Sequence, residues 1–269
     1  MNGLPTFLDE SLQRLFLKEM LATPRGKATL LAQLADAEGG DGGELDIFEH
    51  ILAVLDDDEV EKLVHVHKTD EERHEKLFHE RARASGGDVM KMPSAAHLLR
   101  RLDRHVGFFS KPVTDRAGVV DAYVLLLVIE ERAVRQFGKY RDAFSRAGDL
   151  ATVAVIDQIA KDEERHLKYC HAITKRYSES EDARQKRIAE FRVLEERCFD
   201  EVQAMNLRLL VDNGFVGHTW WTKALWGRLS RMAEARLPAD FYDAGVNGVN
   251  GVNGAHATVS ASSEVAAAA

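Results

Sequence analysis

A short pattern that occurs twice constrains the fold of this chain more than any other feature of its sequence. Residues 68–80 read KTDEERHEKLFHE, and residues 160–172 read AKDEERHLKYCHA. Each copy places a glutamate three residues before a histidine, so on a helix the two side chains share one face, about one turn apart. Apolar residues at helical spacing run through both pairs, which predicts that the pairs face the interior of a helical protein. These pairs are Glu71 with His74 and Glu163 with His166.

Buried glutamate and histidine side chains need partners, because burying an unpaired charge costs on the order of several kcal/mol. A metal ion is one such partner, and carboxylate and imidazole groups are ligands that suit iron and manganese. The alternative interpretation is a solvated face of alternating charge, in which Asp70 and His74 pair across one turn. That alternative fits a single copy better than two copies that both follow apolar stripes. The repeat therefore predicts two halves of one metal site.

A third carboxylate is expected from a long helix at 115–145. Glu130 lies on the apolar stripe of that helix, whereas Glu131 lies on a more polar side. Glu130 and Glu163 are also equally far from the turn between their helices, so they meet across a helical hairpin. We therefore expect Glu130 to join the site.

The fourth carboxylate is less tightly fixed by the sequence. We choose Glu44, which lies on the apolar stripe of its own expected helix, ahead of Glu38 and then Glu49. Glu38 precedes Glu71 by thirty-three residues, the interval that also separates the two glutamates of the other hairpin. The glycine-rich segment 39–43 argues against a continuous helix through Glu38, because glycine weakens helices.

Hydrophobic periodicity and turn residues predict an all-α fold. The four helices that carry the candidate glutamates are joined by a short, a long and a short connection. That order fits an antiparallel four-helix bundle with one long crossover. We divide the chain into an N-terminal helix (1–25), the bundle (26–177), a C-terminal helical extension (178–240) and a disordered low-complexity tail (241–269). The expected helices span residues 6–22, 27–38, 44–55, 58–84, 94–104, 115–145, 150–177, 178–212 and 220–236.

Composition and charge exclude several classes of protein. The net charge of −8 and the pI near 5.8 do not provide the basic surface expected of general nucleic-acid binding. Cys170 and Cys198 are too few for a disulfide framework or a zinc ribbon. The N-terminus lacks the basic start and apolar run of a signal peptide, and the longest apolar run, 122–129, is too short to span a bilayer. We therefore expect a cytoplasmic protein.

The candidate ligands resemble those of the ferritin-like superfamily, over residues 44–176. The pattern is similar to that of rubrerythrin-like and demethoxyubiquinone-hydroxylase-like members. The resemblance implies two iron ions, with manganese or a mixed pair as alternatives, that react with dioxygen or peroxide. It also implies an external electron donor, because the chain carries no four-cysteine rubredoxin module. The glycine-rich segment, the added helices and the tail depart from the family pattern. The implied ligands are Glu44, Glu71, His74, Glu130, Glu163 and His166.

Three functions are compatible with this pattern. The first is a di-iron carboxylate oxidoreductase, which the resemblance favours. The second is an iron-handling protein of the ferroxidase or storage type. The third is a helical scaffold whose metal site is structural or vestigial.

Three neighbouring residues and one C-terminal segment admit two interpretations each. Asp70 and Asp162 lie four residues before each histidine and can orient an imidazole, but solvated helix acids are the favoured interpretation. His67, one turn before Glu71, is expected to be a core or supporting histidine and not an extra ligand, since the other copy has isoleucine at the matching position. The basic, tryptophan-bearing segment 220–236 can pack on the bundle or on a partner in a homodimer, which we favour over peripheral contact with a membrane.

Overall fold

A computed structural model of the chain describes residues 10–39, 45–238 and 241. Every regular element within these residues is helical, which confirms the predicted all-α class. The elements are α1 (Glu10–Met20), α2 (Pro24–Glu38), α3 (Leu45–Leu52), α4 (Asp58–Ala84), the 3-10 turn η1 (Ser94–Ala96), α5 (Leu98–Val106), α6 (Arg116–Arg146), α7 (Leu150–Tyr177), α8 (Glu181–Asp212) and α9 (Trp220–Glu234).

Polar capping residues set the helix boundaries close to those predicted. Asp57 precedes α4, and its side chain accepts hydrogen bonds from the backbone N–H groups of Glu59 and Val60. Asp149 caps α7 in the same way through the N–H of Thr152. These bonds satisfy N–H groups that have no partner inside the helix. The helices α4 and α7 consequently have the bounds that the sequence predicted.

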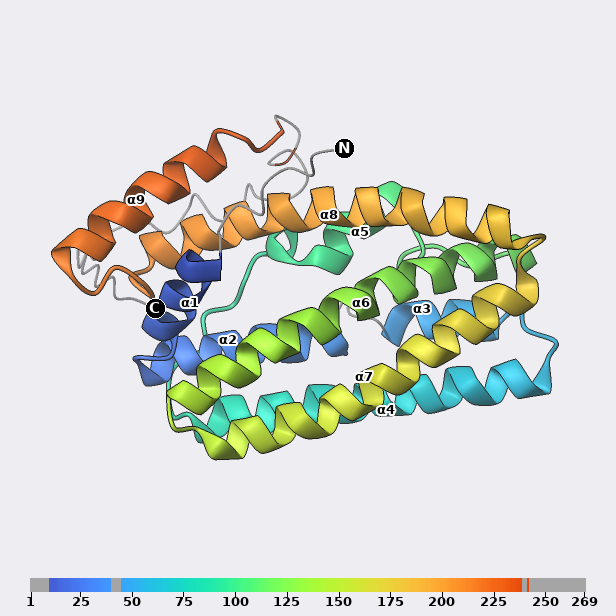
Figure 1. Cartoon of the computed structure of the whole chain (residues 1–269), viewed down its shortest axis with the longest axis horizontal. Helices are drawn as coiled ribbons and strands as arrows, with labels where there is room; N and C mark the ends of the chain where they lie inside the picture. Colours follow the sequence, from blue (N-terminus) through green and yellow to red (C-terminus); the bar gives the residue numbers. More distant parts are fainter. Residues whose placement is uncertain (1–9, 40–44, 239–240, 242–269) are drawn as a thin grey trace, which may run out of the picture.

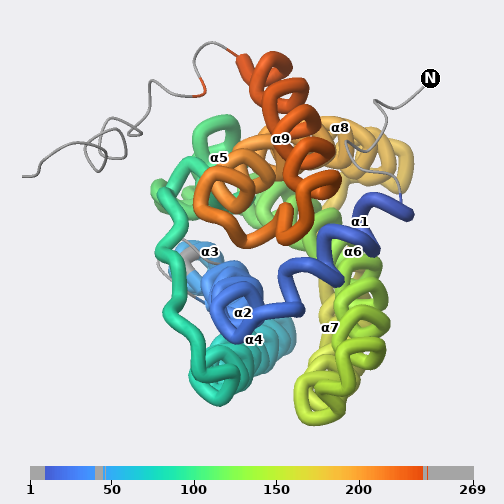
Figure 2. The backbone as a smooth tube through the Cα atoms, turned by 90° about the vertical axis from the view of Figure 1, so that its left-hand side faces the viewer, coloured from blue at the N-terminus to red at the C-terminus, as the bar shows by residue number. Residues whose placement is uncertain are grey.

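Two antiparallel helix pairs form the centre of the molecule (Figure 1). In one pair α2 packs along α4, and in the other α6 packs along α7. Contacts between α4 and α7 join the two pairs. The connection between the pairs, from α4 to α6, includes η1 and α5 and runs over to α8. Figure 2, which looks along the pairs, shows α2 and α4 on one side and α6 and α7 on the other.

Two apolar clusters fill opposite ends of this arrangement. One cluster joins α3 to the start of α4, the first half of α6 and the end of α7. The other joins α1 and α2 to the end of α4, the second half of α6 and the start of α7. The predicted metal ligands of α4, α6 and α7 lie at sequence positions between the two clusters on each helix. The core is therefore apolar at both ends and polar in the middle.

The C-terminal helices cover one side of the helix pairs. The helix α8 packs on α6 and α5, and α9 packs on α8 (Figure 1). Trp226 of α9 is buried, and its indole N–H donates to Glu19 Oε2 of α1 at 2.8 Å. Trp220 is 84% exposed, so α9 is attached to the rest of the molecule through only one of its faces. The expectation of a homodimer or a membrane contact at 220–236 stays a prediction.

The packed part of the chain extends beyond α9. Phe241, the first residue of the predicted tail, is fully buried beside Met92 and Met205, and Arg101 lies over its ring. The residues after Phe241 lie outside those that the structure describes. None of the described helices is long and apolar enough to cross a membrane.

Candidate metal centre

Five of the six predicted ligands lie together in the interior. They are nearly or fully inaccessible to solvent, and they come from α4, α6 and α7. The predicted ligand Glu44 lies outside the described residues. Glu38, the last residue of α2 and the second choice from the sequence, lies in the cluster. The five are Glu71, His74, Glu130, Glu163 and His166.

The polar residues form two overlapping groups. We define group 1 as His67, Glu71, Glu130 and His166, and group 2 as Glu38, Glu71, His74 and Glu163. Within each group, one potential ligand atom from every residue lies within 4.8 Å of all the others. Glu71 belongs to both groups. All seven residues are buried, so any charge among them needs a partner inside the cluster.

The two glutamates of the repeat each face both histidines of the repeat. Glu71 places Oε1 2.9 Å from His166 Nδ1 and Oε2 3.3 Å from His74 Nδ1. Glu163 places Oε1 and Oε2 3.4 Å from the Nδ1 atoms of His74 and His166, respectively. Each carboxylate can therefore serve two metal positions at once.

Glu38 and Glu130 each approach only one histidine of the repeat. Glu38 Oε2 lies 3.5 Å from His74 Nδ1, and Glu130 Oε1 lies 3.5 Å from His166 Nδ1. They flank the pair of glutamates that faces both histidines. The arrangement is that of two adjacent sites with shared carboxylates between them.

The far side of each imidazole faces an aspartate from the other copy of the repeat. His74 Nε2 lies 3.3 Å from Asp162 Oδ2, and His166 Nε2 lies 3.3 Å from Asp70 Oδ2. An imidazole that donates from Nε2 carries its lone pair on Nδ1, which points at the glutamates. The favoured expectation that the aspartates are solvated is wrong, because Asp70 is 5% and Asp162 7% exposed. Their burial follows from the close packing of α4 on α7.

Two arginines add further contacts between α4 and α7 at these aspartates. Arg73 contacts Asp70 at 2.8 Å and Asp162 at 2.5 Å, while Arg165 contacts them at 2.6 Å and 2.7 Å. Each guanidinium therefore joins the two helices and balances the buried aspartate charge. Sequence reasoning did not assign these arginines, although their occurrence in both copies was an available signal.

Five side-chain atoms that face one another in the cluster are buried without a hydrogen-bond partner. Their neighbours are close, but the contacts do not have hydrogen-bond geometry. Each such atom costs free energy of about 1–3 kcal/mol unless another group satisfies it. A cation between them would do so. The five atoms are Glu71 Oε1 and Oε2, Glu163 Oε1, and the Nδ1 atoms of His74 and His166. His67 Nδ1 is also without a hydrogen-bond partner, but it is Nε2 of that ring that faces Glu130.

The electrostatics of the cluster also favour a cation. Burial and the negative charge of Glu71 raise the pKa of Glu38 to about 8. Burial opposes protonation of His74, yet its contacts with Glu38 and Glu71 raise its pKa to about 10. Burial and the charge of Glu130 raise the pKa of Glu163 well above its ordinary value. The cluster thus retains protons at neutral pH that a bound metal ion would displace.

Two alternative glutamates from the sequence lie elsewhere. Glu131 pairs with Arg192 of α8 at 2.6 Å, which leaves Glu130 as the inward carboxylate of α6. Glu49, the third choice for the first helix, has a largely exposed side chain that pairs with Lys68. His67 is the residue that sequence reasoning placed outside the ligand set and that the structure brings into group 1.

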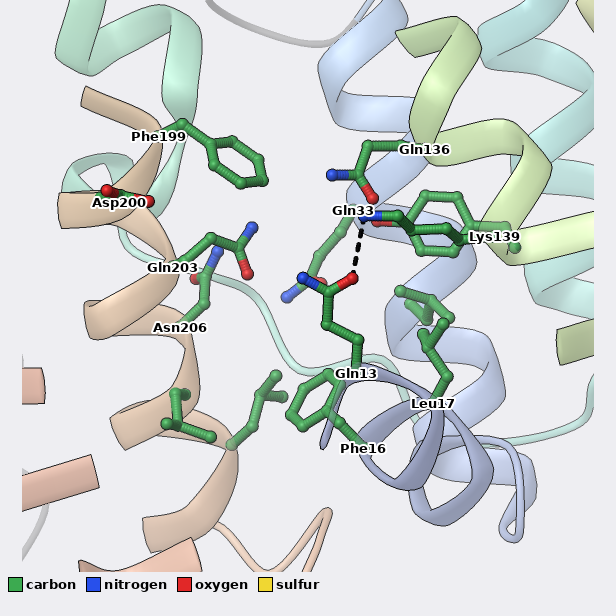
Figure 3. Close-up of a pocket in the computed structure, with 14 residues that line it drawn as sticks. Gln13, Phe16, Leu17, Gln33, Gln136, Lys139, Phe199, Asp200, Gln203 and Asn206 are labelled. Carbon is green, nitrogen blue, oxygen red and sulfur yellow. Dashed lines mark hydrogen bonds between the residues drawn. The ribbon is translucent and has the colours of Figure 1, made fainter. Parts of the chain in front are cut away.

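A separate cavity with both polar and apolar side chains in its lining lies between α1, α2, α6 and α8. Figure 3 shows Gln13, Gln136 and Gln203 pointing into a shared space, with Lys139 donating to Gln13 Oε1 at 2.8 Å. Gln33 Nε2 is among the buried atoms without a hydrogen-bond partner at this cavity. The cavity lining does not include residues of group 1 or group 2.

The potential ligand atoms indicate which kind of ion the cluster can hold. No family model, curated protein or solved structure compared with this chain matches it. Groups 1 and 2 offer carboxylate oxygens and imidazole nitrogens from buried residues. Such atoms suit divalent first-row metals. The cluster can hold metal ions in two adjacent positions.

Proposed function

We propose that this protein is a di-iron carboxylate oxidoreductase that activates dioxygen or peroxide at groups 1 and 2. The single observation that carries the proposal is the set of five unsatisfied ligand atoms in the buried cluster. A protein that used these residues only for packing would leave their desolvation uncompensated. Two cations between them would satisfy all five atoms.

The ligand arrangement fits two ions. His166 and Glu130 would hold one ion, and His74 and Glu38 the other. Glu71 would lie between them, with Glu163 beside it. Two bound irons would supply reversible electron transfer next to coordination positions that an oxidant can occupy.

Residues around the ligands have separate tasks. Asp70 and Asp162 hold the imidazoles with Nδ1 facing the glutamates. Arg73 and Arg165 balance the aspartate charges and tie α4 to α7. The apolar clusters at both ends exclude bulk water, which strengthens electrostatic interactions among the buried groups.

The proposed fold family is the ferritin-like superfamily. Two antiparallel helix pairs, one long connection between them and ligands from α2, α4, α6 and α7 support this assignment. In such bundles, Glu-x-x-His pairs on two helices and single glutamates on two others project inward. The same arrangement of Glu71, His74, Glu163 and His166 supports the assignment here.

The cavity between α1, α2, α6 and α8 supports an oxidoreductase over an iron store. Gln33 precedes Glu38 by five residues on α2, and Gln136 follows Glu130 by six on α6. With a rise of about 1.5 Å per residue, the cavity wall is roughly 7–9 Å along these helices from the carboxylates. Side-chain amides and Lys139 can bind a small polar organic molecule there.

Redox cycling tests the proposed function. The apoprotein is loaded with ferrous iron without oxygen, exposed to dioxygen or hydrogen peroxide, and followed by optical absorption. We expect a ferric band that forms, disappears on reduction and forms again, in a small species by size exclusion. Bound iron that does not react with either oxidant would contradict the proposal. A large assembly that accumulates many irons per chain would indicate storage instead.

A further inference from the structure

The two groups differ in one ligand. Group 1 contains two histidines, His67 and His166, whereas group 2 contains only His74. We propose that His67 is a third histidine ligand, so that the two metal positions are inequivalent and group 1 fills first. This inference rests on the proposed metal binding and goes beyond the six-ligand set that the sequence predicted.

The position of His67 is that of a ligand. Its side chain is fully buried, and Nε2 lies 2.8 Å from Glu130 Oε1 and 3.5 Å from Glu71 Oε1. The same two oxygens lie 3.5 Å and 2.9 Å from His166 Nδ1. Two nitrogens and two oxygens from four residues therefore surround one small volume. A cation there would have two imidazole nitrogens within reach.

Packing fixes the orientation of the His67 ring. The ring lies against that of His166, with centroids 3.9 Å apart and an angle of 35° between the planes. Phe48 of α3 also contacts the ring, at a centroid distance of 4.7 Å. A side chain held in this way loses little further freedom when it binds a metal ion, which favours binding.

Comparison of the two copies of the repeat shows that only one of them has a histidine at this position. Ile159 lies four residues before Glu163, as His67 lies four residues before Glu71, and it is also fully buried. Ile159 packs in the apolar cluster at the α1 and α2 end. Group 2 therefore has no imidazole at the corresponding place. Among divalent metals, an added nitrogen ligand favours ions such as Co²⁺ and Fe²⁺ over Mn²⁺.

The competing role for His67 is to orient Glu130 through a hydrogen bond from Nε2. Two substitutions separate these roles. His67→Gln keeps an N–H donor but removes the imidazole, and His67→Ile installs the residue of the other copy. His65→Gln is the matched control, because His65 lies on the exposed side of the same helix.

Anaerobic titration of the apoprotein with Co²⁺ tests the inference, with visible absorption and equilibrium dialysis as readouts. We expect the wild type and His65→Gln to bind two ions in two resolved steps. In both His67 variants the tighter step should weaken by at least about tenfold, which is the lower bound for residues that support a metal. Binding that is unchanged in His67→Gln would assign His67 to hydrogen bonding and overturn the inference.

A second measurement needs no variant and so does not depend on folding of a substituted chain. In the NMR spectrum of the Co²⁺-loaded wild type, each coordinated imidazole gives a shifted exchangeable N–H signal. Three such signals are expected, and two would overturn the inference while leaving the metal site in place. A wild type that binds no Co²⁺ at all would overturn both this inference and the proposed metal binding.

Discussion

At the residue scale, the two copies of the repeat are interlocked. The aspartate of each copy faces the histidine of the other, and each arginine contacts both aspartates. The first glutamate and the histidine of each copy face the centre, while the second glutamate, Glu72 or Glu164, is exposed. Four of the five repeated residues, the aspartate, the first glutamate, the arginine and the histidine, therefore belong to the cluster or contact residues that support it. The second glutamate can serve as a control position for substitutions.

The first prediction concerns the shared carboxylates. Glu71→Gln or Glu163→Gln should lower metal affinity by more than about a hundredfold, since each loses a charged ligand and not only a supporting group. Glu72→Gln and Glu164→Gln make the same chemical change one residue away and should bind metal as the wild type does. Equilibrium dialysis measures both. Equal affinity in the two pairs of variants would contradict the assigned ligands.

The second prediction concerns the buried aspartates. Asp70→Asn or Asp162→Asn should reduce metal affinity by about 10–100-fold, because the imidazole tautomer is then less firmly held. Each substitution should affect chiefly the histidine of the other copy, His166 for Asp70 and His74 for Asp162. Histidine NMR signals in the loaded protein report which ring changes. A change confined to the histidine of the same copy would refute the crossed arrangement.

Sequence reasoning identified most of the residues in the buried cluster, because charged residues on an apolar helix stripe can be recognised without a structure. Glu71, His74, Glu130, Glu163 and His166 were all identified in this way. The first-helix ligand was harder, because two signals disagreed. The thirty-three-residue interval indicated Glu38, and the glycines that follow argued against it. In the structure α2 ends at Glu38, so Glu38 reaches the cluster without a helix that continues through the glycines.

His67 was underestimated for a related reason. The other copy has Ile159 at the matching position, which suggested that His67 is a core residue and not a ligand. The two copies differ at this position, and only the three-dimensional packing shows that the His67 ring lies in group 1. The contacts of Asp70 with His166 and of Asp162 with His74 could not be predicted from the sequence either, because each joins two different helices.

At the element scale, the turn between α6 and α7 holds three helices together. Asp149 accepts from the N–H of Thr152 at the start of α7 and also contacts Lys27 of α2 and Arg81 of α4. Burial opposes its ionisation, but these hydrogen bonds and cations outweigh burial and lower its pKa below the ordinary 3.8. One carboxylate therefore links the first, second and fourth helices of the paired arrangement.

The third prediction follows from that linkage. Asp149→Asn keeps a capping residue but removes the charge, and should lower the free energy of unfolding by about 1–2 kcal/mol at pH 7. Because the folded pKa is depressed, the stabilisation is present above the unfolded pKa and is lost as the pH falls through the folded pKa. The difference between the two proteins should therefore shrink as the pH falls below 3.8. Urea unfolding at pH 7 and at an acidic pH below 3.8 measures this.

A matched substitution makes the third prediction specific. Asp142→Asn changes an exposed aspartate at the end of α6 that pairs only across one turn with Arg146. It should change the free energy of unfolding by no more than about 0.5 kcal/mol at either pH. If the free energies of unfolding of the wild type and Asp149→Asn differ as much at low pH as at pH 7, the electrostatic explanation is contradicted.

At the scale of the whole molecule, the polar cluster separates two apolar cores. The cores supply the hydrophobic stabilisation, and the cluster between them weakens the metal-free protein through its unsatisfied groups. Local helix propensity and capping predicted the elements well, because those signals are short-range. The way in which α8 and α9 cover the helix pairs depends on long-range packing, which the sequence pattern does not specify.

The fourth prediction is that metal binding stabilises the whole protein against unfolding. An ion at a concentration a hundredfold above its Kd adds about 2.7 kcal/mol to the native state. For a chain of this size, that corresponds to a rise in Tm of roughly 5–10 °C. Differential scanning calorimetry of the apoprotein with and without Fe²⁺ or Co²⁺, in the absence of oxygen, measures the shift. The Glu71→Gln, Glu163→Gln double variant should show almost none, and an equal shift in it would place the bound metal elsewhere.

The stoichiometry of bound iron tests the central claim most directly. Apoprotein is incubated with excess ferrous iron without oxygen, freed of loose metal, and analysed for iron per chain beside the Glu71→Gln, Glu163→Gln double variant. Two irons in the wild type and almost none in the double variant are the predicted result. A folded wild type that retains no more iron than the double variant would contradict the claim that groups 1 and 2 form a metal centre.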